Sequence, residues 1–134
     1  DKNEDKIVMI RVHDSGDFYS KEYQEMWYQI AEDLIDFPNL VLYAYTKMIS
    51  QSKALEKMQP SNFDLIYSFG GSEDHLIDVE SDKHSKVFES EEELIKNGYI
   101  NGTDDDKNAV IGPKKIGLVY HGGKSYKNTS WKGN

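Results

Sequence analysis

Three apolar runs, separated by helix-forming sequence, constrain the fold more than any other feature of the chain. They span residues 7–12, 40–45 and 64–69, the last of which also contains Asp64 and Ser68. Continuous apolar runs, in place of alternating apolar and polar residues, are typical of parallel strands that are buried on both faces. We therefore predict three strands of a parallel sheet. We expect the first of them, which only Arg11 interrupts, to be buried on both faces.

Helical segments lie between these runs, and a further helix and a fourth strand follow them. Ser20 is placed to cap a helix. Apolar residues recur in this helix with a 3.6-residue period, at Tyr23, Met26, Trp27, Ile30, Leu34 and Phe37. A shorter helix is predicted around residues 52–59, and a Ser-x-x-Glu capping box at Ser90 opens another. Residues 116–120 predict a fourth strand. The fold class is therefore α/β, with a mainly parallel sheet of four or five strands and crossover helices.

Length, charge and cysteine content narrow the class of protein. The 134 residues fit a single α/β domain, with a polar amino-terminal tail over residues 1–5. The net charge of −8 argues against nucleic acid as a partner, because phosphate backbones select basic surfaces. The chain has no cysteine, which excludes an iron–sulfur cluster, a disulfide and a thiolate metal site within these residues. No apolar run approaches the roughly 20 residues of a membrane helix, so we expect a soluble, cytoplasmic protein.

Polar and glycine residues gather where the predicted strands end. In a parallel sheet the carboxyl ends of the strands meet at one edge, where ligand sites are found. In chain order, the residues that follow the four strands are His13, Asp14, Ser15 and Asp17; Thr46 and Lys47; Ser68, Gly70 and Gly71; and His121, Gly122 and Lys124. The sequence therefore predicts one polar pocket at this edge. The alternative is that these residues only form turns, as polar and glycine residues often do.

The residues after the first strand are the catalytic candidates. A histidine beside a carboxylate can act as a general base near neutral pH, so we assign His13 this role and expect Asp14 and Asp17 to orient it. The same residue types bind divalent ions, and the candidate metal ligands are His13, Asp17, His84 and His121. No two histidines have the short spacing of a zinc motif. Asp17 can instead cap the helix that follows it.

Lysine and glycine residues at the other strand ends predict an anion site. Successive backbone N–H groups of Gly70 and Gly71 can hold a phosphate or carboxylate, with the charge of Lys47 or Lys124 nearby. The spacing of a P-loop is absent. The predicted ligand-binding residues are Ser15, Thr46, Lys47, Ser68, Gly70, Gly71, His121, Gly122 and Lys124. We therefore predict a small anionic ligand and leave the cofactor open.

Four segments of the chain resemble the phage gene product 88 family. They are RVHDSGDFYS at residues 11–20, YAYTK at 43–47, YSFGG at 67–71 and GLVYHG at 117–122. The resemblance implies a phage or prophage protein of undefined activity, acting in the bacterial host cell, with a fold like part of a radical-SAM-type (β/α) barrel. It also implies longer relatives with a cysteine-containing amino-terminal part. This chain is then either a portion of such a protein or a short relative without a cluster.

Two functions are consistent with these observations. The first is an enzyme, or a degenerate enzyme, acting on a small phosphorylated or nucleotide-like ligand, whose anionic group Lys47 and Lys124 hold beside His13. The alternative is a non-catalytic acidic phage protein that binds and inhibits a host protein, since a net charge of −8 steers association with a basic surface. Ligand binding that depends on His13 favours the first function. Host binding that weakens with added salt favours the second.

Overall fold

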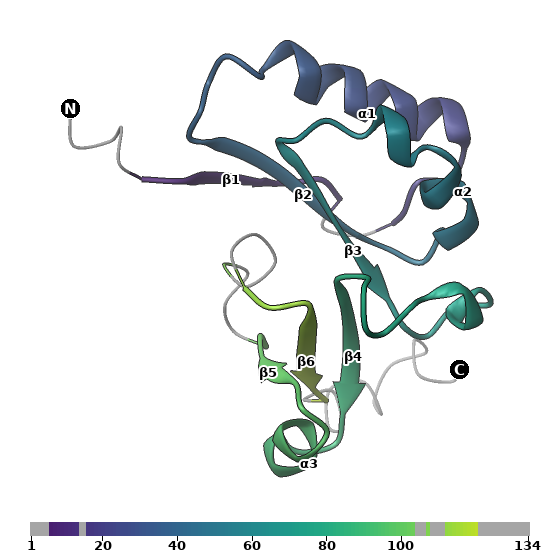
Figure 1. Cartoon of the computed structure of the whole chain (residues 1–134), viewed down its shortest axis with the longest axis vertical. Coiled ribbons are helices and arrows are strands. Elements are labelled where there is room, and N and C mark those ends of the chain that lie inside the picture. Colours follow the sequence, from purple (N-terminus) through teal and green to yellow (C-terminus); the bar gives the residue numbers. More distant parts are fainter. Residues whose placement is uncertain (1–5, 14–15, 104–106, 108–111, 121–134) are drawn as a thin grey trace.

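Six parallel strands form one sheet in the part of the chain that the computed structural model describes, namely residues 6–13, 16–103, 107 and 112–120 (Figure 1). The strands are β1 (Val8–Arg11), β2 (Leu40–Thr46), β3 (Phe63–Ser68), β4 (His84–Phe88), β5 (Ile100–Asn101) and β6 (Lys115–Val119). The helical elements are α1 (Lys21–Asp33), α2 (Ile49–Ala54), α3 (Glu91–Lys96) and the short 3₁₀ turns η2 (Glu56–Met58) and η3 (Asp74–Leu76).

The strands lie in the order β1, β2, β3, β4, β6, β5, and every neighbouring pair is parallel. The predicted α/β class is confirmed, and the curved sheet forms a half-barrel with helices. The sheet has six strands rather than the four or five that we predicted, because two strands carry little apolar signal. β4 has the sequence HSKVF, and β5 is two residues long.

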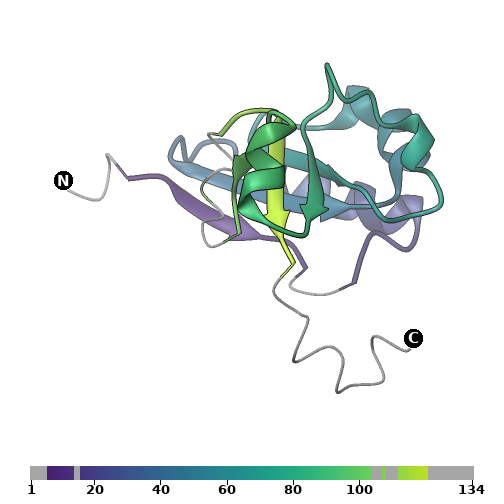
Figure 2. The same cartoon turned by 90° about the horizontal axis from the view of Figure 1, so that it is seen from below.

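A short junction divides the sheet into two parts. β3 and β4 pair only through Tyr67 with His84 and Ser68 with Ser85. We call β1 to β3 with α1 and α2 the amino-terminal half, and β4 to β6 with α3 the carboxyl-terminal half. α1 and α2 lie at one end of the molecule and α3 at the other (Figure 1). Seen from below, α3 lies in front of β6 (Figure 2). The two halves are therefore covered by separate helices.

The core of the amino-terminal half lies between α1 and the sheet. Phe18, Leu42 and Phe63 are buried there, and the Phe63 ring lies 5.1 Å from that of Tyr28 on α1. Ser20 caps α1 as predicted, because its Oγ accepts a hydrogen bond from a backbone N–H of the first turn. The apolar run of β2 is thus buried under a capped helix, which is the arrangement that the sequence predicts.

The buried face of α1 is rotated from the predicted stripe. Gln24 is fully buried, whereas Met26, which we predicted to face the core, is 46% exposed. Phe37, the last residue of the predicted stripe, lies beyond the end of α1 and is 59% exposed. The Gln24 amide nitrogen donates to Tyr28 Oη at 3.0 Å and to Ser52 Oγ at 2.9 Å. These hydrogen bonds offset the desolvation of the amide, so a polar residue occupies a place that apolar periodicity cannot predict.

The prediction that the first strand is buried on both faces is wrong. β1 is an edge strand, paired on one side only among the described strands. Its side chains Val8 and Ile10 are 52% and 39% exposed. The position of a strand in the sheet decides its burial, and an apolar run alone does not reveal whether the strand is central or at an edge.

In the carboxyl-terminal half, α3 packs directly on β6. The capping box at Ser90 is confirmed, because its Oγ accepts from Glu93 N at 3.2 Å. Leu94 is fully buried above Gly117 of β6. A Cβ added at Gly117 would lie 2.2 Å from Leu94 Cγ, so only glycine allows this approach. The contact between Leu94 and Gly117 therefore holds α3 against β6.

Candidate functional site

A pocket of about 330 Å³ opens at the carboxyl ends of five of the six described strands. The residues that line it are Arg11, His13, Gly16, Asp17, Tyr45, Thr46, Lys47, Ser68, Gly102, Thr103 and Leu118. They come from β1, β2, β3 and β6 and from the loops that follow β1, β2 and β5. Both halves of the sheet therefore contribute to one pocket.

The structure brings together part of the predicted site. The predicted residues that line the pocket are His13, Asp17, Thr46, Lys47 and Ser68. Gly70 and Gly71 pack against Lys47 but do not line the pocket, and His84 lies elsewhere. Asp14, Ser15, His121, Gly122 and Lys124 lie outside the described residues.

Asp17 fastens the loop after β1 to the end of β2. Its Oδ1 accepts from Thr46 Oγ1 at 2.5 Å and from Phe18 N at 2.7 Å, and its Oδ2 accepts from Lys47 N at 2.8 Å. Ser20, rather than Asp17, caps α1. Three donors thus engage the carboxylate, and the two from Thr46 and Lys47 link the loop after β1 to the end of β2. The orienting role that we assigned to Asp17 stays a prediction.

Lys47 reaches the pocket along a glycine surface. A Cβ at Gly71 would lie 3.1 Å from Lys47 Cβ and 3.3 Å from its Cδ, so a larger residue would crowd the stem. Lys47 Nζ donates to Ser68 Oγ at 3.4 Å. Where the structure describes the chain, no carboxylate forms an ion pair with this ammonium group. Lys47 is thus a positioned cation with no carboxylate partner among the described residues.

The N–H groups of Gly70 and Gly71 bind a carboxylate of the protein itself. Gly70 N donates to both carboxylate oxygens of Asp74 at 3.0 Å, and Gly71 N donates to Oδ1 at 3.0 Å. These N–H groups therefore do not serve the anionic ligand that we predicted for them. The glycine pair does have the anion-binding geometry that its sequence suggests, but the anion is Asp74 of η3.

His13 lies where β1 ends, in a backbone conformation that residues other than glycine rarely adopt. Its φ is 73°, which is energetically unfavourable for such a residue. Nε2 lies 2.8 Å from Tyr23 Oη, and the two rings stack at 5.4 Å. Nδ1 is buried and, among the described residues, has no hydrogen-bond partner. In this conformation Tyr23 occupies Nε2, and Nδ1 is buried away from solvent. The general-base role of His13 therefore stays a prediction.

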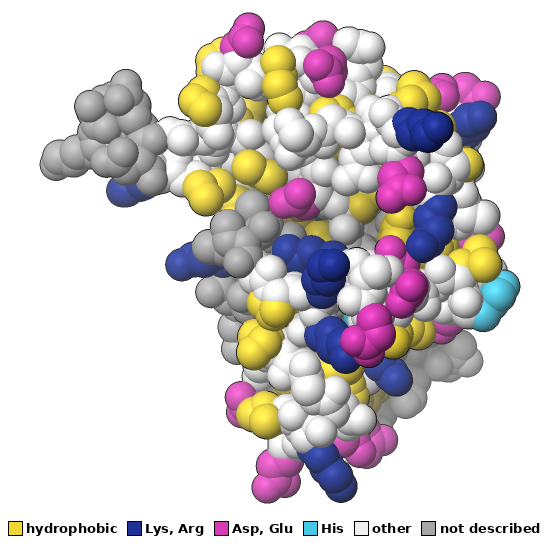
Figure 3. All heavy atoms as spheres, viewed as in Figure 1, with side chains coloured by type: hydrophobic (Ala, Val, Ile, Leu, Met, Phe, Trp, Pro, Cys, Tyr) yellow, Lys and Arg dark blue, Asp and Glu magenta, His cyan; other side chains and the backbone are white. Residues whose placement is uncertain are grey.

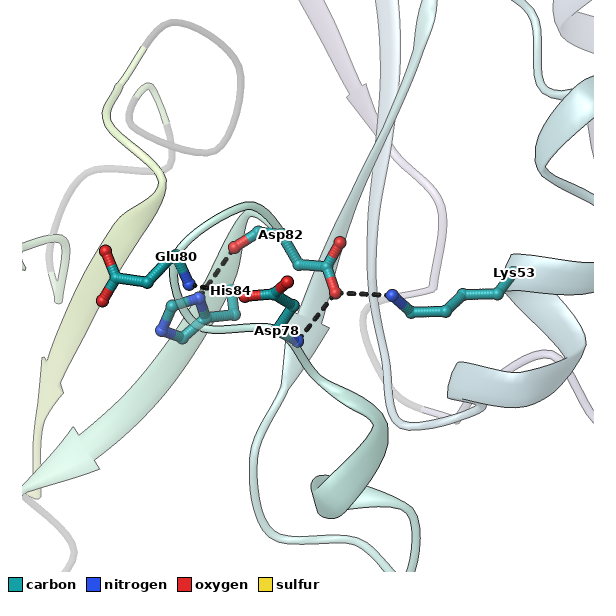
Figure 4. A network of polar contacts seen from close by, with 5 residues as sticks. All are labelled: Lys53, Asp78, Glu80, Asp82 and His84. Atoms are coloured by element: carbon teal, nitrogen blue, oxygen red, sulfur yellow. Dashed lines mark hydrogen bonds and ion pairs between the residues drawn. The ribbon is translucent and has the colours of Figure 1, made fainter.

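The candidate metal ligands do not form a cluster where they are described. His84 is fully buried, and its Nδ1 lies 2.8 Å from the Asp82 carbonyl oxygen (Figure 4). Its Nε2 lies 2.8 Å from Tyr99 Oη. Asp82 is fixed in turn by Lys53 Nζ, which lies 2.7 Å from its carboxylate. His84, one of our candidate metal ligands, is therefore a core histidine in this structure, with both ring nitrogens engaged. No three His, Cys, Asp or Glu side chains in the described part of the chain form a group that could hold a metal.

The remaining lining residues were hard to find from the sequence. Arg11 is the exception, since a charged residue inside an apolar strand is a visible signal. Tyr45 and Leu118 belong to apolar runs, where nothing distinguishes a pocket residue from a core residue. Gly102 and Thr103 follow β5, which is too short to show periodicity.

The surface of the molecule carries both signs of charge. On the face shown in Figure 3, acidic and basic side chains alternate and form no continuous acidic area.

Among the described residues no helix has the length and apolar character needed to span a bilayer.

Comparison with known proteins places the chain in a family. No curated protein and no solved structure matched it. A family model described as Gene product 88 matches residues 1–132, which is nearly the whole chain. The four segments that carry the resemblance, among them the one containing His13 and Asp17, fall within this match. The protein therefore belongs to the gene product 88 family of phage proteins.

Proposed function

We propose that the protein binds a small phosphorylated ligand in the pocket at the strand ends. One observation carries this proposal. Lys47 lines the pocket with no ion-paired carboxylate among the described residues, and three donors already engage the carboxylate of Asp17, which also lines the pocket. The ammonium group of Lys47 can therefore attract an anion into the pocket, although the net charge of the protein is −8.

The polar groups around Lys47 suit the oxygens of a phosphate. Ser68 Oγ accepts from Lys47, and Thr103 Oγ1 accepts from Val119 N at 2.8 Å, so both hydroxyl hydrogens remain to donate. The Thr46 hydroxyl is different, because it already donates to Asp17. Lys47, Ser68 and Thr103 are thus the donors that we assign to the phosphate, and charge-assisted hydrogen bonds of this kind are strong.

Calorimetric titration with inorganic phosphate tests the proposal. We expect Lys47→Met to weaken phosphate binding at least about tenfold, since a hydrogen bond to a charged group contributes about 1.5–3 kcal/mol. Lys57→Met is the matched control, because Lys57 is an exposed lysine of η2 and does not line the pocket. Absence of phosphate binding in the unchanged protein, or equal binding by both variants, contradicts the proposal.

The alternative function, inhibition of a host protein through an acidic surface, stays a prediction. The mixed charges in Figure 3 give it no support on that face. If it holds, affinity for the host partner falls steeply as salt is added, because exposed charges are screened. Phosphate binding at Lys47 does not depend on that outcome.

A further inference from the structure

His13 lines the pocket, but in this conformation its Nε2 contacts Tyr23 and its Nδ1 is buried. We propose that His13 is a further phosphate-binding residue, and that the hydroxyl of Tyr23 competes with the phosphate for its imidazole ring. This inference rests on the proposed function, because it takes the phosphate to lie at Lys47. It adds a second side chain that binds the phosphate and a contact that regulates the affinity of the pocket.

The conformation of His13 is unfavourable in two independent respects. Its backbone φ of 73° is one that residues other than glycine rarely adopt. Its Nδ1 is buried and has no hydrogen-bond partner among the described residues. This nitrogen is a donor in one tautomer and an acceptor in the other, so its burial costs free energy in both. A ring position in which both nitrogens find partners would remove the second of these costs.

The hydroxyl of Tyr23 supplies the polar contact that keeps the ring of His13 in place. Nε2 lies 2.8 Å from Tyr23 Oη. The ring contacts of His13 are with aromatic side chains, namely Tyr23 at 5.4 Å and Phe18 at 4.8 Å between ring centres. A hydrogen bond to a phosphate is stronger than one to a phenol, because the phosphate is charged. A bound phosphate can therefore compete with Tyr23 for the imidazole.

Tyr23 is fixed more firmly than His13, so the histidine is the residue that moves. Tyr23 lies in the first turn of α1, where its backbone N–H donates to Ser20 Oγ at 3.1 Å. The other side of this contact is also packed, because the Tyr23 ring stacks on that of Tyr19 at 4.5 Å. His13 lies in the loop between β1 and α1.

The loop after β1 keeps His13 beside the proposed phosphate site. His13 and Lys47 line the same pocket of about 330 Å³. Asp17, four residues after His13, accepts a hydrogen bond from the backbone N–H of Lys47 at 2.8 Å. A phosphate at Lys47 has several oxygens that accept hydrogen bonds, and the imidazole has an N–H to donate in either tautomer. His13 and Lys47 can therefore bind the same phosphate.

Calorimetric titration with inorganic phosphate tests this inference through Tyr23→Phe, which removes the hydroxyl and keeps the ring. We expect this variant to bind phosphate about two- to tenfold more tightly than the unchanged protein, since the net contribution of one hydrogen bond corresponds to this range. A purely structural role of Tyr23 would not give a gain in affinity. Tyr19→Phe is the matched control, because Tyr19 is 77% exposed in the same stack of rings, and its affinity should not change.

A second variant shows whether the gain depends on His13. His13→Phe keeps an aromatic ring against Phe18 and Tyr23 and removes both nitrogens. In the His13→Phe protein, the further change Tyr23→Phe should leave phosphate affinity unchanged. Denaturant unfolding of each variant confirms that folded protein is titrated. In NMR spectra of the unchanged protein, nuclear Overhauser contacts between the His13 and Tyr23 rings should disappear as phosphate saturates the pocket.

The outcomes separate this inference from the proposed function. Three results would overturn the role of His13 and leave phosphate binding at Lys47 standing: no gain in affinity for Tyr23→Phe, a gain that persists without the His13 nitrogens, or ring contacts that persist at saturation. If the unchanged protein does not bind phosphate, the proposed function and this inference both fail.

Discussion

The amino-terminal half of the sheet is supported by a 13-residue helix and a large aromatic core, whereas the carboxyl-terminal half is supported by the six-residue helix α3. Phe18 and Phe63 are buried in this core, and Phe63 begins β3, the strand that ends at Ser68. The other half supplies Thr103 to the pocket from beyond a two-residue strand. This difference indicates that the charged side chains of the pocket lie on the better packed half, and that the other half completes the wall of the pocket.

The largest effect is expected from opening the aromatic core. Phe63→Ala removes a fully buried ring that contacts Tyr28, and it should lower the free energy of unfolding by about 3–5 kcal/mol. Denaturant unfolding measures this change. Phe37→Ala is the matched control, since Phe37 is 59% exposed and its loss should change the free energy by less than about 0.5 kcal/mol. If Phe63→Ala lowered the free energy of unfolding less than Leu94→Ala does, the carboxyl-terminal half would be the better packed of the two.

A second prediction concerns the contact that holds the carboxyl-terminal half. Gly117→Ala places a methyl group 2.2 Å from Leu94 Cγ, and such overpacking should cost about 1–3 kcal/mol of stability. The double variant with Leu94→Ala should lose less stability than the sum of the two single variants, because the second change makes room for the methyl group. Strict additivity of the two changes in denaturant unfolding would show that this contact does not anchor α3.

Asp17→Asn tests the connection between two strand ends within the better packed half. An asparagine can replace one accepting oxygen, but its amide nitrogen would face a donor, Thr46 Oγ1 or Lys47 N. We expect a loss of about 1–2 kcal/mol in thermal or denaturant unfolding. Asp36→Asn, at an exposed position, should leave stability unchanged. Equal stability of the two variants would mean that the Asp17 hydrogen bonds contribute nothing.

Alkaline pH probes the amino-terminal core with a smaller effect. Burial raises the pKa of Tyr28 to about 12, and the hydrogen bond with Gln24 partly opposes this rise. Between pH 10 and 11 the unfolded chain loses this proton and the folded chain keeps it, so stability falls as pH rises. Tyr28→Phe should reduce that fall by about 1 kcal/mol in unfolding curves at the two pH values. An identical fall in both proteins would mean that Tyr28 does not resist ionisation.

The parts of the fold that could be predicted are those that local sequence determines. The run at residues 40–45 is apolar throughout, and Ser20 and Ser90 cap helices through contacts only three residues away. β4 could not be predicted because its sequence, HSKVF, carries little apolar signal and its burial depends on residues elsewhere in the chain. Buried His84 is satisfied by Tyr99, and nothing near it in the sequence indicates that contact.

The candidate site shows the same division. The rule that parallel strands end at one edge placed Asp17, Lys47 and Ser68 together. It could not reveal that the N–H groups of the glycine pair at residues 70–71 are taken by Asp74, because this depends on how the following loop folds back. The same rule could not identify Tyr45 as a pocket residue, because the apolar sequence of its strand does not differ from that of a strand buried in a core.

The central claim is that both halves of the sheet form one anion-binding pocket. Amide NMR spectra of nitrogen-labelled protein, recorded during titration with inorganic phosphate, test it most directly. The claim predicts that the amide signals of Lys47 and Ser68 in one half, and of Gly102 and Thr103 in the other, shift together with a single dissociation constant. Shifts confined to one half, or scattered over the surface with no common constant, would contradict it.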